Sequence, residues 1–519
     1  IRCGQPLACW KETDVAWVAE LPDVGNGKWE FRELFINGRR CLRARHPNRG
    51  YFRVAKAGPD DRTSFQFRPE DLKAWPDLDQ VELVFLHDWS TSRVRFAAIS
   101  ETDNMAHLAD PIGSAAPHYA ISHFEAHPRY FVENSLAFLD APGEWHLDRK
   151  AGSLRYRPQD GDAIQTASAV APRLQRLVSV TGDLAAGRPV RGLCFRGLTF
   201  AHCGWNLPAK GYAAGQAGFH DGNRYADPAT RGRVSMPAAV TFDLADDCLI
   251  ENCHFTHLGG AGLFLRQTCR RNRIAKCTFR DIAGNGVMIG ETFTRQAASR
   301  GATPPADGAL VCRENVIEDS TIEHCGAEFF GCVGIWVGIA AETVIAHNEI
   351  RNLPYTGVSV GWSWNPKPTG CRGNRVEQNH IHHVMQILSD GGGIYTLGRQ
   401  PGTMLSGNVI HDIVPNAGRA ESNGMFLDEG TTELVIENNL IYATARSPLR
   451  FHRAEENRVS QNILVTPPDV PIVRYNATDA KKIKLIENDV IESAQWRPDS
   501  DPPHQRLKKI LPAVGPRNP

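Results

Sequence analysis

The sequence lacks an excess of charge of either sign and has no long apolar run. Lysine and arginine together number 58, as do aspartate and glutamate, and no basic tract stands out. A nucleic acid or an anionic membrane surface is therefore a poorly supported partner. No segment approaches the ~20 apolar residues that a membrane-spanning helix needs. We therefore predict neither a nucleic-acid partner nor a membrane span.

Paired cysteine motifs are also absent. The 13 cysteines include no CxxC pair, and several, such as Cys253 and Cys277, stand at repeated positions of the chain. This placement favours small buried core residues over a disulfide framework or a zinc cluster.

Helical periodicity is nearly absent, whereas a short Asn-x-apolar unit recurs along the chain. It begins at Asn348, Asn379, Asn408, Asn439, Asn462 and Asn488, with spacings of 31, 29, 31, 23 and 26 residues. One such unit cannot bury its own apolar face, so the repeat indicates a solenoid. Stacked asparagine side chains can hydrogen-bond from coil to coil, which explains the recurrence.

A second strand follows within each coil and starts with a glycine, as in Gly357-Val-Ser-Val, Gly393-Ile-Tyr-Thr and Gly424-Met-Phe-Leu. These patterns predict an all-β protein built on a right-handed parallel β-helix, with an additional antiparallel β-sandwich-like domain at the N-terminus. We expect the antiparallel domain over residues 1–170, the β-helix over 171–495 and a tail over 496–519.

Specific strands and loops follow from the same reading. The predicted strands of the N-terminal domain include 29–36, 81–86 and 94–99, which alternate apolar and polar residues. Residues 205–235 and 292–310 break the repeat spacing and are predicted to be long loops that project from the β-helix.

Several strings together resemble a known family. They are Phe31–Arg40, Pro142–Arg149, Leu353–Trp364, Ser389–Gly398 and Leu427–Gly430. The chain resembles the β-helical glycoside hydrolases of family 141 and, more distantly, the β-xylosidases of family 120. The resemblance implies hydrolysis of plant-type glycans, with α-L-fucosidase and xylanase activities known in the first family. It also implies a periplasmic or secreted protein, although this sequence contains no signal segment.

Glycosidic cleavage normally requires two carboxyl groups on either side of the scissile bond. Asp390, before three glycines, and Asp428 and Glu429, at the end of the next coil's strand, are the predicted catalytic residues. We assign Asp428 as nucleophile or base and Glu429 as the possible acid. The seven-residue offset between Asp390 and Asp428 would span ~23 Å on a straight strand. The pair therefore requires the glycine run to bulge, and Glu421 is the reserve candidate.

Other residues near these carboxylates are predicted to contact sugar, because tryptophan faces pack on sugar rings and polar groups bond hydroxyls. Core packing is the alternative for the tryptophans and Tyr395. The predicted substrate contacts are Trp362, Trp364, Tyr395, Arg399, His383 and His452. A histidine cluster at His380, His382, His383 and His411 has no carboxylate at a fixed ligand spacing, so we predict no metal and no cofactor.

The sequence thus predicts a glycoside hydrolase that acts on an oligosaccharide or polysaccharide. A lyase that cleaves uronic-acid polymers is the alternative enzyme, supported by Arg399, Arg450 and Arg453. A non-catalytic carbohydrate-binding solenoid is the alternative without chemistry. The sugar, the anomer and the oligomeric state do not follow from the sequence.

Overall fold

The structure is a computed structural model that describes residues 1–8, 10–114, 116–183, 185–225, 232–292, 311–415, 418–499 and 506–517. The predicted loop 292–310 therefore lies almost entirely outside the described residues. None of the described helices has the length and apolar character needed to cross a bilayer.

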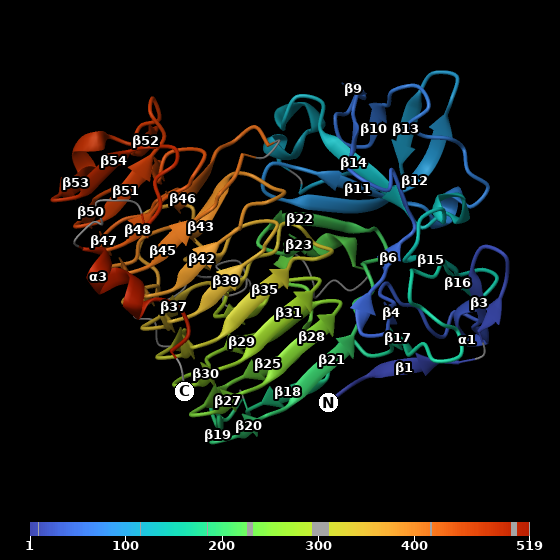
Figure 1. The fold of residues 1–519 in the computed structure, drawn as a ribbon, viewed down its shortest axis with the longest axis horizontal. Coiled ribbons are helices and arrows are strands. Elements are labelled where there is room, and N and C mark those ends of the chain that lie inside the picture. The colour runs from blue at the N-terminus through green and yellow to red at the C-terminus, as the bar shows by residue number, and fades with distance from the viewer. Residues whose placement is uncertain are drawn as a thin grey trace.

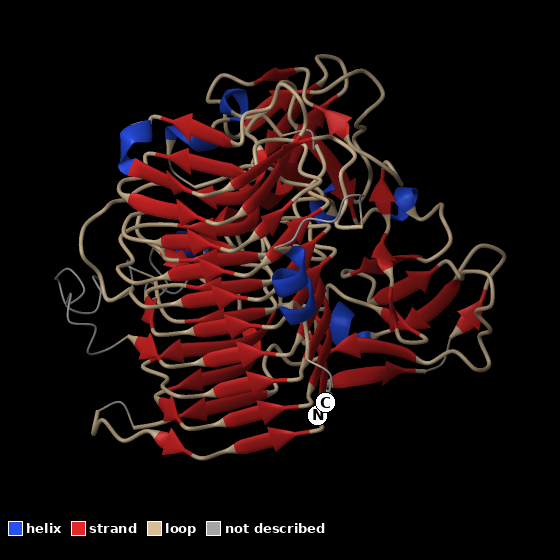
Figure 2. Cartoon of the chain, turned by 60° about the vertical axis from the view of Figure 1, so that its left-hand side comes forward, coloured by secondary structure: helices blue, strands red, loops and turns tan. Residues whose placement is uncertain are grey.

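Three parallel sheets of ten strands each form the larger part of the molecule, and their strands stack coil upon coil (Figures 1 and 2). Sheet 1 consists, in spatial order, of β18 (Val178–Thr181), β25 (Ala238–Asp243), β29 (Ala261–Gln267), β32 (Val287–Ile289), β36 (Ile335–Val337), β40 (Val358–Val360), β43 (Gly391–Thr396), β46 (Ser422–Leu427), β49 (Leu449–His452) and β52 (Val473–Asn476).

Sheet 2 consists of β20 (Cys194–Arg196), β27 (Leu249–Glu251), β30 (Arg273–Ala275), β34 (Val316–Glu318), β38 (Val344–Ala346), β41 (Arg375–Glu377), β44 (Met404–Ser406), β47 (Val435–Glu437), β50 (Asn457–Ser460) and β53 (Ile483–Ile486). Sheet 3 consists of β21 (Thr199–Cys203), β28 (His254–Leu258), β31 (Thr278–Ile282), β35 (Thr321–Cys325), β39 (Glu349–Arg351), β42 (His380–His382), β45 (Val409–His411), β48 (Leu440–Ile441), β51 (Ile463–Thr466) and β54 (Asp489–Glu492). Two short parallel pairs complete the coils, namely β19 (Val190–Arg191) with β26 (Ala245–Asp246) and β33 (Cys312–Arg313) with β37 (Ala340–Ala341).

The predicted asparagine ladder holds these coils together. The side-chain amide of Asn379 donates to Oδ1 of Asn408 at 3.0 Å, and the amide of Asn408 donates to Oδ1 of Asn439 at the same distance. The ladder continues from Asn348 at one end to Asn488 at the other. Each interior amide also bonds a backbone carbonyl, so these buried polar groups are satisfied inside the stack.

The described cysteines are free thiols, and most of them are buried, as predicted. Cys253 and Cys277 are 0% and 1% exposed and belong to the apolar core of the β-helix. They fill the narrow interior as small apolar side chains.

The N-terminal part folds into nearly all-antiparallel sheets beside the β-helix (Figure 1). A four-stranded sheet contains β1 (Gly4–Leu7), β17 (Ala169–Pro172), β4 (Phe35–Ile36) and β5 (Arg39–Arg40), and a five-stranded sheet contains β2 (Lys11–Glu12), β3 (Trp17–Glu20), β16 (Ser153–Tyr156), β15 (Glu144–Asp148) and β6 (Leu42–Arg43). The largest sheet contains β24 (Arg233–Val234), β23 (Phe219–Asp221), β22 (Tyr212–Gln216), β12 (Thr91–Ser100), β11 (Glu82–Leu86), β14 (Arg129–Glu133), β7 (Arg45–His46), β8 (Phe52–Arg53), β9 (Lys56–Ala57), β10 (Ser64–Gln66) and β13 (Met105–Leu108).

Two details differ from the sequence-based expectations. Of the predicted strand 29–36 only Phe35–Ile36 pairs, because Trp29 and Phe31 instead bury their rings in the core of this domain. The predicted loop 205–235 contains strands, and its β22 pairs antiparallel with β12, with Ala213 opposite Ser92. A segment that leaves the β-helix therefore extends the N-terminal domain's sheet.

The described helices are short and lie at turns and near the C-terminus. They are α1 (Pro22–Gly25), α3 (Leu507–Ile510), η1 (Leu78–Gln80), η2 (Pro117–Tyr119), η3 (Ile121–His123), η4 (Leu136–Phe138), η5 (Gly222–Arg224), η7 (Ala480–Lys482) and η8 (Leu511–Ala513). Leu507 and Ile510 of α3 pack on Leu440 and Ile463 of sheet 3, so the tail covers the last coils.

Candidate active site

A row of outward side chains on sheet 1 forms the floor of the candidate site. Tyr395 of β43 pairs with Ser359 of β40 on one side and with Phe426 of β46 on the other, and Phe426 pairs with Arg450 of β49. These positions alternate with interior residues such as Ile394 and Met425, so their side chains point away from the interior of the β-helix. Tyr395 and Phe426 are nevertheless only 2% and 1% exposed, because neighbouring segments cover them.

Asp390 lies at one end of this row, immediately before β43. Its backbone has a φ of 59°, and its carboxylate Oδ1 accepts a hydrogen bond from Arg450 at 2.9 Å. Burial raises the pKa of Asp390 to about 6, opposed by Arg450 and supported by the nearby charge of Asp428. The side chain is still 25% exposed, which leaves it accessible to a ligand.

Asp428 follows β46 at the other end of the row. Its Oδ2 accepts a 2.6 Å hydrogen bond from the hydroxyl of Tyr395, and its Oδ1 lies 2.7 Å from Nδ1 of His452. Asp390 and Asp428 therefore have different surroundings, the first desolvated and the second bonded by two donors.

Tyr355 and Gln216 add a polar layer that the sequence did not reveal. The hydroxyl of Tyr355 donates to the backbone carbonyl of Asp390 at 2.9 Å. The side-chain amide of Gln216 lies beside the hydroxyls of both Tyr355 and Tyr395. Gln216 ends β22, and the carbonyl of the preceding Gly215 accepts hydrogen bonds from Trp89 and Tyr119 of the N-terminal domain.

The N-terminal domain also contacts the turn before β43. The backbone amide of Ser389 donates to the carbonyl of Asp88 at 2.6 Å, and the Asp88 carboxylate accepts from the amide of Arg419 at 2.7 Å. The turn that places Asp390 is thus fixed by a loop about 300 residues away in sequence.

The glycine run Gly391–Gly393 is not bulged, contrary to the expectation from the seven-residue offset. The register between β43 and β46 stays constant from Gly391 to Thr396. The glycines are needed for close packing, since a Cβ at Gly391 would lie 2.5 Å from Thr356 Oγ1 and one at Gly393 would lie 2.6 Å from Ile410 Cγ2. The chain instead turns at Asp390 itself, where φ is 59°, and the Asp390 carboxylate still lies within reach of the charge of Asp428.

Glu429 and Glu421 lie next to the site but have other partners. The carboxylate of Glu429 accepts a 2.7 Å hydrogen bond from Arg453 near the surface. Glu421 stands beside Asp390 on the next coil, because Ser422 pairs with Gly391, and its carboxylate is 3.7 Å from Arg474.

The predicted tryptophan contacts are divided between core and surface. Trp362 is 2% exposed and packs edge-on against Trp336, with ring centroids 5.3 Å apart. Trp364 is partly exposed, with the guanidinium of Arg233 5.0 Å from its ring centroid. Only Trp364 therefore presents ring surface to solvent.

Arg399 and His383 lie apart from the carboxylates. Arg399 forms a two-fold ion pair with Glu433, at 2.9 and 3.0 Å. His383 follows β42 of sheet 3, and its Nδ1 lies 2.7 Å from that of His382. In this structure neither residue contacts Asp390 or Asp428.

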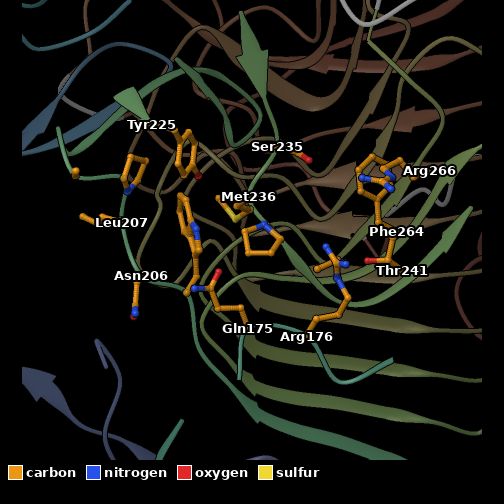
Figure 3. Close-up of a pocket in the computed structure, with 15 residues that line it drawn as sticks. Gln175, Arg176, Asn206, Leu207, Tyr225, Ser235, Met236, Thr241, Phe264 and Arg266 are labelled. Atoms are coloured by element: carbon orange, nitrogen blue, oxygen red, sulfur yellow. The ribbon is translucent and has the colours of Figure 1, made fainter. Parts of the chain in front are cut away.

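A separate pocket opens over the first coils of sheet 1 (Figure 3). Its volume is about 530 Å³, and its wall combines Thr241 of β25 and Phe264 of β29 with Arg266, Tyr225 and Met236. Phe264 packs edge-on against the buried Trp336, with centroids 6.2 Å apart. Through Trp336 this pocket adjoins the aromatic cluster that includes Trp362.

Comparisons with known proteins show which families and structures this architecture is similar to. Residues 14–159 match the family model of the GH141 insertion domain, and residues 236–371 and 312–490 match that of the right-handed β-helix region. A solved structure described as a glycoside hydrolase superposes with a TM-score of 0.76 at 24% identity, covering 99% of this chain and 84% of the other. No curated protein matches the chain.

Two further solved structures are more distant. XylC in complex with xylose aligns at 11% identity with a TM-score of 0.45, over 96% of this chain and 76% of its own. A GH136 lacto-N-biosidase from Eubacterium ramulus aligns at 12% identity with a TM-score of 0.41, over 62% of this chain and 60% of its own.

The fold is thus a right-handed parallel β-helix, and its N-terminal part is similar to the insertion domain of the family 141 glycoside hydrolases. The matches confirm the predicted right-handed parallel β-helix with its added β domain, and they confirm the resemblance to the glycoside hydrolases of family 141.

Proposed function

We propose that this protein hydrolyses glycosidic bonds of plant-type glycans, with Asp390 and Asp428 as the catalytic carboxyl pair. The observation that carries the proposal is the contrast between the two groups: the pKa of Asp390 is raised to about 6, whereas Asp428 accepts hydrogen bonds from Tyr395 and His452. A glycosidase uses two carboxyl groups, one that donates a proton to the leaving oxygen and one that acts as nucleophile or base.

In this proposal Asp390 is the general acid. Near neutral pH it retains a proton in part of the molecules and donates it to the glycosidic oxygen as the bond to the anomeric carbon breaks. Asp428 either attacks the anomeric carbon or takes a proton from the attacking water. The sequence-based assignment named Glu429 as the possible acid, and we propose Asp390 in its place because the Glu429 carboxylate is bound by Arg453 at 2.7 Å.

The substrate class follows from the family resemblance. Fucosides, xylosides and related sugars of plant cell-wall oligosaccharides or polysaccharides are the proposed substrates. Such polymers are met outside the cytoplasm, so we propose a periplasmic or secreted location. Trp364 is the side chain best placed to stack on a sugar ring beyond the scissile bond, since its ring is partly exposed.

A screen of nitrophenyl fucoside, xyloside, arabinofuranoside and galactoside tests the proposal. We expect release from at least one of them, reduced roughly 10²–10⁴-fold by Asp390→Asn and by Asp428→Asn. Glu437→Gln, which changes a carboxylate of sheet 2, is the matched control and should keep full activity. Unchanged activity in either aspartate variant would reject the pair, and wild-type inactivity on these glycosides and on plant polysaccharides would favour a carbohydrate-binding solenoid.

The lyase alternative draws on one observation, the cation of Arg450 in the same outward row as the phenol of Tyr395, with Phe426 between them. Lyases neutralise a uronic carboxylate with a cation and remove the neighbouring proton with a base. A lyase forms an unsaturated product that absorbs ultraviolet light, whereas a hydrolase forms a new reducing end without such absorbance. Product absorbance on polygalacturonate or alginate therefore separates the two reactions.

A further inference from the structure

A second cluster of ionisable side chains lies on sheet 3, whereas the proposed carboxyl pair lies at the strands of sheet 1. Glu349 of β39 pairs with His380 of β42, and His382 of β42 pairs with His411 of β45. All four positions alternate with the core residues Ile350, Ile381 and Ile410, so their side chains stand on the outer face of the sheet.

The side chains of this cluster are in direct contact. One oxygen of Glu349 lies 2.6 Å from Nε2 of His382, and the other lies 2.9 Å from Nδ1 of His380. Nε2 of His380 lies 2.8 Å from Nε2 of His411, whose Nδ1 lies 2.6 Å from Asp412 Oδ2. The contacts thus form one chain from Asp412 through His411 and His380 to Glu349 and His382.

Neutral histidines cannot satisfy this chain. Nδ1 of His411 must carry a proton to donate to Asp412, so its Nε2 is an acceptor and Nε2 of His380 must donate to it. A neutral His380 then has a bare Nδ1, which faces a carboxylate oxygen of Glu349 at 2.9 Å. Two acceptors cannot bond each other, so either a second proton on His380 or a bound cation must occupy the position between Glu349 and His380.

We propose that a divalent metal ion of the zinc type supplies this charge, bound by Glu349, His380 and His382. One ligand atom from each of the three residues lies within 4.8 Å of the others. Two imidazole nitrogens and one carboxylate oxygen form a ligand set that zinc accepts, with a fourth position left for water. The side chain of His380 is 33% exposed, which gives the ion a route from solvent.

The remaining contacts fit a metal site as well. With the ion on Nδ1 of His380, its Nε2 proton donates to His411, and His411 donates to Asp412. With the ion on Nε2 of His382, its Nδ1 proton donates to Nδ1 of His383 at 2.7 Å. Ligand imidazoles are commonly oriented by such outer hydrogen bonds. The nearest arginine of the row, Arg351, is paired with Glu323 at 3.0 Å.

The spacing explains why the sequence predicted no metal. Glu349 precedes His380 by 31 residues, which is the length of one coil, so the carboxylate reaches the histidines only through the register of stacked strands. The ion would link the coil of β39 to that of β42 and would stabilise the stack. This role is independent of the proposed glycosidase activity.

Calorimetric titration of the metal-free full chain with ZnCl₂ tests the proposal. A Cys194→Ser background removes the one described cysteine that is exposed, so that its thiol does not compete. We expect one zinc ion per chain and a rise in melting temperature on zinc addition. Both effects should be lost in His382→Ala and in Glu349→Ala. His254→Ala is the matched control, because His254 is exposed and belongs to the same outward row, at the register position of Glu349 on an earlier coil.

A positioning variant distinguishes a metal site from a general loss of structure. His411→Phe keeps the ring but removes the acceptor for His380, and we expect zinc to bind roughly 10–100-fold more weakly. Failure of the wild type to bind one equivalent, or binding that survives His382→Ala, would overturn the proposal. In that case His380 holds a second proton in place of the ion. Neither outcome bears on glycosidase activity.

Discussion

Arg450 and Asp390 stand two coils apart on sheet 1 and form an ion pair of 2.9 Å. The guanidinium lies against Phe426, 4.0 Å from the ring centroid, and its Nε donates to Asn476 at 3.0 Å. Arg450 is thus held in place from three directions. The ion pair opposes the effect of burial on Asp390, so Arg450 sets how readily the proposed acid releases its proton.

The pH dependence of hydrolysis should report the protonation of Asp390. The pKa of Asp390 is about 6, and the proposed acid is active only when protonated. We expect kcat/KM to fall as the pH rises above about 6, because kcat/KM reports the free enzyme. A pH–rate profile between pH 4 and 9 on a glycoside that the enzyme cleaves measures this descending limb, the pH range over which kcat/KM falls. An activity that increases through this range would contradict the role of Asp390 as acid.

Arg450→Gln should move the same limb toward higher pH. Arg450 lowers the pKa of Asp390, so its removal leaves burial and the charge of Asp428 to raise the pKa further. The informative measurement is the position of the limb, because a merely structural loss would reduce activity at every pH alike. Arg458→Gln on β50, an exposed arginine of sheet 2, provides the comparison and should leave the limb in place.

Tyr395→Phe removes the hydroxyl that donates to Asp428 at 2.6 Å. A hydrogen bond to a charged group contributes about 1.5–3 kcal/mol, so we expect a loss of roughly 10–100-fold in kcat/KM. Tyr475→Phe on β52 of the same sheet is the control. Equal kinetics in the two variants would separate Tyr395 from the chemistry.

Asn408→Ala should destabilise the β-helix by about 2–4 kcal/mol. The substitution removes three donated bonds, to Val376, Ser406 and Asn439, and removes the Oδ1 that accepts from the buried side-chain amide of Asn379. Asn488→Ala, at the partly buried end of the ladder, should cost less. Urea unfolding of both variants measures the difference, and equal costs would refute a cooperative ladder.

Glu33 predicts a pH-dependent stability. Burial raises its pKa from 4.5 to about 7, so between these values the native state binds more protons than the unfolded state. Stability should therefore decrease as the pH rises through this range. Glu33→Gln removes this contribution, and its free energy of unfolding should fall less between pH 5 and pH 8 than that of the wild type. Denaturant unfolding at both pH values provides the comparison.

The repeat made the β-helix predictable, because Asn408 and its equivalents keep one position in the coils from Asn348 to Asn488. The same counting places Tyr395 and Phe426 two residues after the coil glycines Gly393 and Gly424, so this part of the outward row was within reach of the sequence. Asp428 and Tyr395 were singled out from the sequence. Their hydrogen bond was not, because it depends on the rotamers of two side chains on neighbouring coils.

The contribution of Gln216 was beyond sequence reasoning. It comes from a segment that interrupts the repeat, and its position depends on the pairing of β22 with β12 in a different domain. The glycine run was misread for a related reason. Its glycines are required because Thr356 and Ile410 on adjacent coils leave no room for a Cβ, and the local sequence does not show this contact.

The pairing of β22 with β12 has a consequence for synthesis of the chain. Ser92 acquires its partner Ala213 only after more than a hundred further residues have been made, so this part of the β12 edge stays open while the ribosome continues. An open strand edge invites pairing with other chains. Truncation before residue 212 should accordingly yield an aggregation-prone fragment, and the N-terminal domain matures only together with the first coils of the β-helix.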